Sequence, residues 1–367
     1  MAYLLTLGSG LYLTGIMAIS PIYFMFVISL VTALIFSNKV IYVNSSVGLF
    51  YIVLLLSFFL FAFHLLDGSD AVREGLGFVF TFGYFVIAHI AVRKCSKGEL
   101  INLTIVLAKL SILMGTCDAI YRFLNPAKFK IGEETFHIFK ENSLMFEDSN
   151  FTAFFLLSNF LLYSIVMRRN QKFSIFIVFC FLLVILACLS RAAALGVVVF
   201  WIIRYFMDLN YKGKFLILIG SVVIVPTLLF YILSGNESLL SDTVFKLEII
   251  EGSISNLLSL ANIQTIFFGH GFASSSLISG YSSHNFLIEV LYDVGLVGLA
   301  CFAIPTLMLA YVDKRAFALF FVPLFVVSMS FGPLIVPYTY LSLALLLSYS
   351  VACKGIILGG TMRGSNL

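Results

Sequence analysis

Long uninterrupted apolar stretches recur along the whole chain, and they constrain its fold more than any other feature of the sequence. A helix needs about 20 apolar residues to cross the hydrocarbon core of a bilayer. The strands of a membrane barrel would instead alternate apolar and polar residues over stretches of about ten. The stretches here are longer and apolar on every face. We therefore expect an all-α polytopic membrane protein in which residues 1–367 form a single transmembrane domain.

The charge content supports the same class. Only 11% of the residues are charged, whereas a soluble domain carries about 25%. The net charge of +4 is small, and the basic residues lie in short loops rather than on one face, which argues against nucleic acid as a partner. The first partner to expect is therefore the lipid bilayer.

We predict twelve spans. Because Pro21 separates the first two, a single long helix kinked at this proline is the alternative, and it would give eleven spans. The predicted spans are Tyr3–Ile19, Ile22–Ser37, Val47–Phe63, Gly75–Val92, Leu100–Phe123, Asn150–Met167, Phe173–Leu189, Ala192–Phe206, Phe215–Leu233, Asn285–Val312, Ala316–Phe331 and Leu334–Ile357.

Basic residues fall in alternate loops and so predict the orientation. Three acids, Glu99, Asp208 and Asp313, share that side. We expect this side to be cytoplasmic, with the C-terminus on it. The basic residues are Lys39, Arg93, Lys94, Lys97, Arg168, Arg169, Lys172, Arg204, Lys212, Lys214, Lys314, Arg315, Lys354 and Arg363.

The opposite side carries two long loops, residues 124–149 and 234–284. Apolar and charged residues mix in the second loop, where we expect a helix lying over the membrane face of the protein.

Ionisable and amide side chains gather where the predicted spans meet this second side. A charged group inside a span is costly unless it is paired or faces water, so we treat the cluster as the candidate site. Asp118 and Arg122 are four residues apart and share a helix face. The other members are Asp148, Asn150, Arg191, His284, Asn285, Glu289 and Asp293.

Arg191 lies between two apolar runs that leave almost no loop. Its guanidinium is either an interfacial anchor for the helix end or a clamp for phosphate oxygens, which its planar fork fits. His284 suits either a helix cap or a general base near neutral pH. Glu289 and Asp293 share a helix face, and from depth alone we expect them to pair with Lys109.

Several short motifs resemble those of the O-antigen polymerase and O-antigen ligase superfamily, and the order of the motifs and the predicted layout agree with that family. One element resembles the "Lys-x-x-Ser…Asp-x-Asn" entry to a span in Wzy-type polymerases. The segments that carry the resemblance are Tyr121–Phe123 with Asn125–Pro126, Phe139–Ser143, Phe146–Phe151, Leu189–Ala193, Phe268–Phe272, Ser282–Phe286 and Asp293–Gly298.

The chain departs from the family in one respect. The family usually carries a second arginine in the large periplasmic loop, but there is no arginine between Arg204 and Arg315. Lys246 is the only lysine of residues 234–284 and is the candidate substitute, although lysine offers a point charge rather than a fork.

The resemblance implies an inverting, metal-independent glycosyltransferase with a GT-C-like fold and no cofactor, in the bacterial inner membrane with its active site facing the periplasm. Its substrate would be a glycan on undecaprenyl pyrophosphate, and a chain-length regulator is a further candidate partner. Arg191 would hold the leaving pyrophosphate, assisted by Arg122, Lys140 or Lys246. His284 would take the acceptor proton. The residues that would orient this histidine or bind the sugars are Asp148, Asn150, Asn285, Glu289 and Asp293.

Two other functions stay open. A ligase of the same superfamily would transfer finished polymer to lipid A-core. A lipid or polysaccharide transporter would place its ionisable groups near the bilayer midplane, whereas most of those here are expected at one interface. The "Lys-x-x-Ser…Asp-x-Asn" element favours the polymerase.

Overall fold

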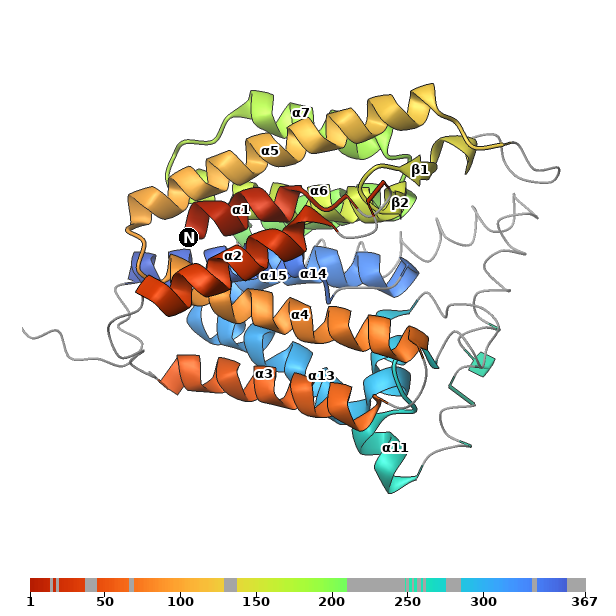
Figure 1. The fold of residues 1–367 in the computed structure, drawn as a ribbon. Helices are drawn as coiled ribbons and strands as arrows, with labels where there is room; N and C mark the ends of the chain where they lie inside the picture. The colour runs from red at the N-terminus through yellow and green to blue at the C-terminus, as the bar shows by residue number, and fades with distance from the viewer. Residues whose placement is uncertain are drawn as a thin grey trace, which may run out of the picture.

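The computed structural model describes residues 1–13, 16–17, 20–36, 45–65, 69–128, 137–209, 248, 251–252, 254–255, 259, 262–274, 285–331 and 335–354. In this part of the chain, helices lie side by side and a short antiparallel hairpin joins two of them (Figure 1). The elements are α1 (Ala2–Gly10), α2 (Pro21–Phe36), α3 (Ser45–Phe63), α4 (Ser69–Val92), α5 (Lys97–Leu124), η1 (His137–Phe139), β1 (Glu141–Ser143), β2 (Glu147–Asp148), α6 (Ser149–Arg169), α7 (Ile175–Ala187), α8 (Arg191–Asp208), α11 (Ile263–Phe268), α13 (Phe286–Val312), α14 (Lys314–Phe331) and α15 (Pro337–Lys354).

Helices α4, α5, α6 and α13 are each long and apolar enough to cross a membrane. Large apolar side chains also cover the outside of the bundle, for example Ile175 and Phe176 of α7, which are 78% and 73% exposed. Such a surface is stable against lipid but not in water. The chain is therefore a mostly helical membrane protein. The twelve-span layout stays a prediction, since the predicted span Phe215–Leu233 lies outside the described residues.

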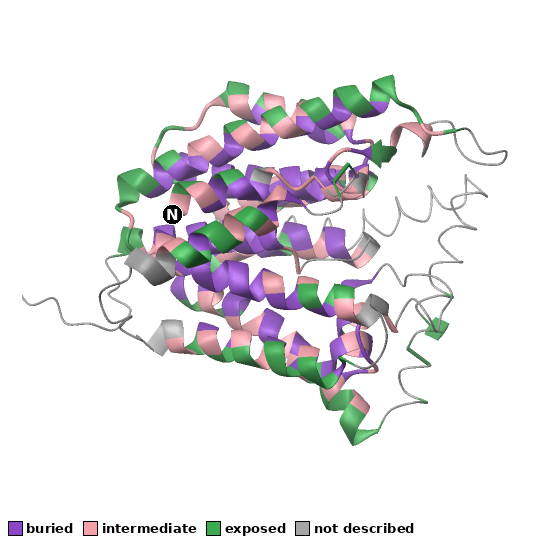
Figure 2. Ribbon diagram, viewed as in Figure 1, coloured by how far each residue is buried: buried purple, intermediate pink, exposed green. Residues whose placement is uncertain are grey.

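Helix α6 forms the centre of the bundle. Its span is 89% buried, and it packs against α5, α7, α8, α14 and α15, as the purple ribbon of Figure 2 illustrates. Asp148 caps its first turn, and Arg168 and Arg169 lie in its last turn, where positive charge suits the helix dipole. An all-round apolar helix of this kind belongs in the interior of a large bundle.

The first two predicted spans are separate helices. Helix α1 ends at Gly10 and α2 begins at Pro21, which suits the first helical position because proline lacks an N–H. The two helices pack against each other, and the Ser20 hydroxyl donates to the Leu11 carbonyl at 2.9 Å in the turn between them. The single helix kinked at Pro21 is therefore wrong, and α1 is shorter than the predicted span.

The bundle has two ends with different chemistry. We call "hairpin end" the end that carries β1, β2 and the N-termini of α6, α8 and α13, which lies to the right in Figure 1. We call "arginine end" the opposite end, which carries the C-termini of α6 and α8 and the N-terminus of α14. The candidate site predicted from sequence falls at the hairpin end.

Candidate functional site

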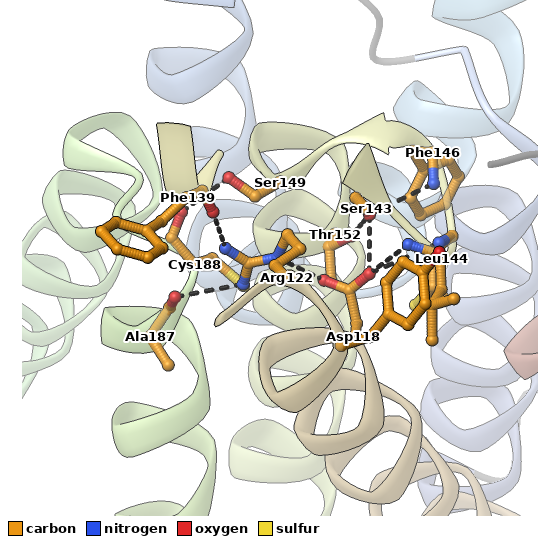
Figure 3. A network of polar contacts seen from close by, with 12 residues as sticks. Asp118, Arg122, Phe139, Ser143, Leu144, Phe146, Ser149, Thr152, Ala187 and Cys188 are labelled. Carbon is orange, nitrogen blue, oxygen red and sulfur yellow. Dashed lines mark hydrogen bonds and ion pairs between the residues drawn. The ribbon is translucent and has the colours of Figure 1, made fainter. Parts of the chain in front are cut away.

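A buried ion pair lies at the hairpin end (Figure 3). Arg122 Nε donates to Asp118 Oδ2 at 2.9 Å, and both side chains are 0% exposed. The other two guanidinium nitrogens donate to main-chain carbonyls, Nη1 to Phe139 at 2.5 Å and Nη2 to Ala187 at 3.1 Å. The predicted shared face of Asp118 and Arg122 is confirmed. Every nitrogen of this guanidinium has a protein acceptor, which is what a buried charge requires.

The second oxygen of Asp118 holds the hairpin. Asp118 Oδ1 accepts from the Ser143 hydroxyl at 2.7 Å and from the Leu144 N–H at 2.7 Å. The Ser143 hydroxyl also lies 3.0 Å from the Thr152 hydroxyl of α6. Asn142 next to it adopts a φ of 60°, a left-handed conformation that asparagine tolerates better than most residues. One carboxylate thus ties α5, β1 and α6 together.

The same network reaches the turn between α7 and α8. Ser149, the first residue of α6, donates its hydroxyl to the Cys188 carbonyl at 2.8 Å. Ser190 caps α8 by accepting from the Ala193 N–H. Arg191 follows as the first residue of α8, and it is exposed. The N-termini of α6 and α8 therefore lie together, with Arg191 at the second of them.

Three more residues of the predicted site, Asp148, Asn150 and Lys140, lie around the start of α6. Asp148 Oδ1 accepts from the Asn150 N–H at 2.8 Å, and the Asn150 side chain contacts Asp148 Oδ2 at 3.3 Å. The Lys140 carbonyl accepts from the Ser149 N–H at 3.0 Å, and the Lys140 side chain is half-buried. Two segments named in the family resemblance, 139–143 and 146–151, are thus neighbours in space.

Two further segments that carry the family resemblance, Phe268–Phe272 and Asp293–Gly298, contact each other through two glycines. Helix α13 breaks at Gly295, whose φ of 61° lies in the region that favours glycine. Gly269, with a φ of 80°, lies directly against this break. A Cβ on Gly269 would come within 2.2 Å of the Asp293 carbonyl oxygen, and a Cβ on Gly295 within 2.6 Å of the Phe267 carbonyl carbon. The backbones pack too closely for any side chain at either position.

Backbone hydrogen bonds and rings complete this second contact. The His270 N–H donates to the Tyr292 carbonyl at 2.8 Å, and their rings stack with centroids 4.5 Å apart. Partial burial lowers the pKa of His270 from its ordinary 6.5. His64 Nε2 of the segment after α3 lies 2.9 Å from the Phe268 carbonyl. The segment Phe268–Phe272 is therefore held from two sides.

Asn285 caps α13, since its side-chain oxygen accepts from the N–H groups of Leu287 and Ile288 at 3.2 and 3.3 Å. Glu289 and Asp293 are half-buried on the same helix. The predicted pairing of these acids with Lys109 is wrong. Lys109 is exposed on α5, which lies on the far side of the bundle from α13 (Figure 1). Depth in the membrane does not determine position around the bundle.

The remaining predictions concern residues outside the described ranges, His284 and Lys246. Among the described residues, no group of three or more His, Cys, Asp or Glu side chains could hold a metal ion. The sequence-based reasoning did not assign Ser143, Ser149 or Thr152. Ser143 and Ser149 lie inside segments that carry the family resemblance, and their hydroxyls build the scaffold rather than protrude from it.

Comparisons with protein-family models, with curated proteins and with solved structures find no match to this chain. Helix α8 begins with an exposed arginine, and the partial positive charge of its N-terminus adds to that of the guanidinium. Such a place is suited to bind a phosphate-bearing group.

Proposed function

We propose that the protein is a glycosyltransferase that polymerises oligosaccharide repeat units carried on undecaprenyl pyrophosphate, with its site at the hairpin end facing the periplasm of the bacterial inner membrane. The observation that carries this proposal is the joining of the N-termini of α6 and α8 by the Ser149–Cys188 hydrogen bond, with Arg191 exposed beside them. The family resemblance supplies the substrate class.

Arg191 acts on the leaving group. Cleavage of the anomeric C–O bond leaves negative charge on the pyrophosphate and positive charge on the sugar. In this proposal the guanidinium of Arg191 and the N–H groups at the start of α8 are the donors to that negative charge. Lys140 is a second cation of the same end, and Lys246 is the candidate for a third.

His284 acts on the acceptor. The acceptor hydroxyl oxygen forms the new bond to the anomeric carbon as the bond to the phosphate oxygen breaks, and the hydroxyl proton passes to the imidazole of His284. The attack comes from the face opposite the pyrophosphate, so the configuration inverts. Asp148, Asn150, Asn285, Glu289 and Asp293 are the candidates to bind the sugars or orient the histidine.

Arg122 and Asp118 have a positioning role in this mechanism. The nitrogens of Arg122 all donate to protein acceptors, and its side chain is fully buried. A guanidinium so occupied holds the hairpin and the α7–α8 turn in place. It acts on the reaction through Arg191 and Lys140 rather than by contact with the pyrophosphate.

The test is to incubate the purified protein in detergent with lipid-linked repeat units and to separate the products by size. A ladder of products that grows by one repeat unit at a time supports the polymerase. Transfer only to a lipid A-core acceptor would make the protein a ligase. Movement of the lipid-linked substrate across vesicles without a new glycosidic bond would make it a transporter, and either result overturns the proposal.

A further inference from the structure

A cleft of about 290 Å³ opens at the arginine end, between α6, α8 and α14. It lies at the far end of α6 from Asp118 and Arg122, a distance of roughly 30 Å for a helix of this length. Four arginines line it, namely Arg168 and Arg169 of α6, Arg204 of α8 and Arg315 of α14. None of them takes part in the network of the hairpin end.

Positive charges outnumber negative charges around this cleft. Arg169 forms a two-pronged ion pair with Asp313. Asp208 bridges the other two helices, with Arg204 Nη2 at 3.1 Å and Arg315 Nη2 at 2.5 Å from its oxygens. Two carboxylates thus form ion pairs with three guanidiniums. Together with Arg168, this group of charges has an excess of two positive charges.

Arg168 has no carboxylate within reach among the described residues. Its guanidinium lies over the rings of Phe173 and Trp201, at 5.7 and 5.9 Å from their centroids. These rings orient a cation and leave its N–H groups for another acceptor. Arginines that only balanced the negative ends of the helix dipoles could point in different directions, whereas these four line one cleft.

Two buried donors at the cleft lack a partner within the described part of the chain. Ser164 is 2% exposed, and its hydroxyl has no hydrogen-bond partner. Arg204 Nε is also buried without a partner. Both residues line the cleft. Because a buried polar atom left unpaired is destabilising, such atoms in native proteins call for an explanation. A small rotation of either side chain toward the cleft would bring its donor within reach of a ligand with several acceptor oxygens.

We infer that this cleft binds the phosphate group of an anionic phospholipid. Guanidinium forks match phosphate oxygens two at a time, and the cleft lies at the ends of apolar helices, where the phosphate of a lipid would lie while its acyl chains stay in the bilayer. Basic pockets at the ends of membrane helices are suited to such headgroups. This site is separate from the proposed active site and does not depend on it.

The test measures lipid binding to the full-length protein in detergent by native mass spectrometry, with phosphatidylglycerol and phosphatidylcholine titrated in parallel. We expect preference for phosphatidylglycerol. Arg168→Gln should weaken its binding at least tenfold, because a hydrogen bond to a charged group contributes about 1.5–3 kcal/mol. Ser164→Ala should weaken it about two- to tenfold, as expected for one neutral hydrogen bond. Arg168 makes no ion pair with a described residue, so its loss should leave the protein folded.

Arg93→Gln is the matched control, since Arg93 lies at the same end after α4 but does not line the cleft. A second arm measures thermal unfolding without added lipid in inorganic phosphate and in chloride of equal ionic strength. Stabilisation by phosphate that is lost in Arg168→Gln, together with equal binding of phosphatidylglycerol and phosphatidylcholine, would make the ligand free phosphate and overturn the assignment to a lipid. Equal weakening by Arg93→Gln and Arg168→Gln, or no effect of either on any arm, would overturn the inference.

Discussion

The guanidinium of Arg122 and the carboxylate of Asp118 form an ion pair at 2.9 Å in which neither side chain is exposed. The pair is one turn apart on α5, yet it binds groups from the hairpin and from the end of α7. Removing two charges from water is expensive, and the attraction between them offsets this cost only when their remaining hydrogen bonds are made. Here those bonds join three segments of the chain at the proposed site.

Asp118→Asn should destabilise the protein strongly. Both oxygens of Asp118 accept hydrogen bonds from donors, so the amide nitrogen of asparagine would face a donor in either orientation. Loss of one partner of a buried pair costs about 3–5 kcal/mol. We expect a clearly lower midpoint of thermal unfolding in detergent.

Asp148→Asn is the matched control for this stability measurement. Asp148 also accepts from N–H groups, as the cap of α6, but asparagine caps helices about as well as aspartate. Its unfolding midpoint should stay close to that of the wild type. Similar midpoints for Asp118→Asn and the wild type would show that the buried pair does not hold the hairpin end together.

Gly295→Ala should also unfold at a lower temperature. Its φ of 61° is costly for a residue with a Cβ, and that Cβ would come within 2.6 Å of the Phe267 carbonyl. The conformational cost is about 1–3 kcal/mol, because φ 61° with ψ −159° is a combination that essentially only glycine adopts, and overpacking adds about 1–3 kcal/mol. Gly269→Ala should behave alike, because each glycine lies against the backbone of the other segment.

Gly77→Ala in α4 is the control for these two substitutions. A Cβ at Gly77 would meet no atom within 4 Å, and alanine favours a helix over glycine. It should unfold no earlier than the wild type. If Gly295→Ala were as stable as Gly77→Ala, the close contact between the Gly269 turn and α13 would have to be abandoned.

Local patterns in the sequence predicted much of this end of the protein. The spacing of Asp118 and Arg122 indicated one helix face, and the predicted span starts at Asn150 and Asn285 fall within one residue of the first residues of α6 and α13, although the caps Asp148 and Asn285 were not predicted. Gly269 and Gly295 were recognisable as parts of motifs. Each of these features depends on residues that are neighbours along the chain.

Contacts between distant segments could not be predicted in this way. Ser143 reaches Asp118 from β1, whose pairing is irregular between Glu141 and Ser143, where Asn142 has a left-handed backbone, and no spacing rule contains that irregularity. Lys109 was assigned to Glu289 and Asp293 from depth alone. Helices of equal depth occupy different positions around a bundle, and the packing of side faces that decides this has no simple signature in one sequence.

His270 should make the stability depend on pH. Burial lowers the pKa of His270 in the folded protein, so the unfolded chain binds a proton more readily near its ordinary value of 6.5. The contribution of neutral His270 to the stability of the folded protein is fully present above about pH 6.5. It is lost as the pH falls through the lowered pKa of His270 in the folded protein. His270→Phe keeps the ring on Tyr292 and should lose less stability than the wild type between pH 7.5 and 5. An identical loss in both proteins would exclude His270 as a source of it.

Arg191→Ala should reduce chain extension by about 100-fold or more, as expected when one donor to a developing charge is removed. Arg191→Lys should keep part of the activity, because lysine retains the charge but not the fork. Rates of ladder formation at equal amounts of folded protein give the measurement. Arg191 is exposed at the first turn of α8, so neither variant should unfold the protein, which the unfolding midpoint checks.

The interfacial-anchor interpretation of Arg191 predicts a different result. An anchor needs only a positive charge at the membrane surface, so Arg191→Lys would then work at the wild-type rate, and Arg191→Ala would reduce the amount of inserted protein rather than its rate per molecule. Arg93→Ala, at the opposite end of the bundle, should leave the rate of chain extension unchanged. If Arg191→Ala extends chains as fast per molecule as Arg93→Ala does, the guanidinium has no part in holding the pyrophosphate, and the proposed mechanism loses its principal cation.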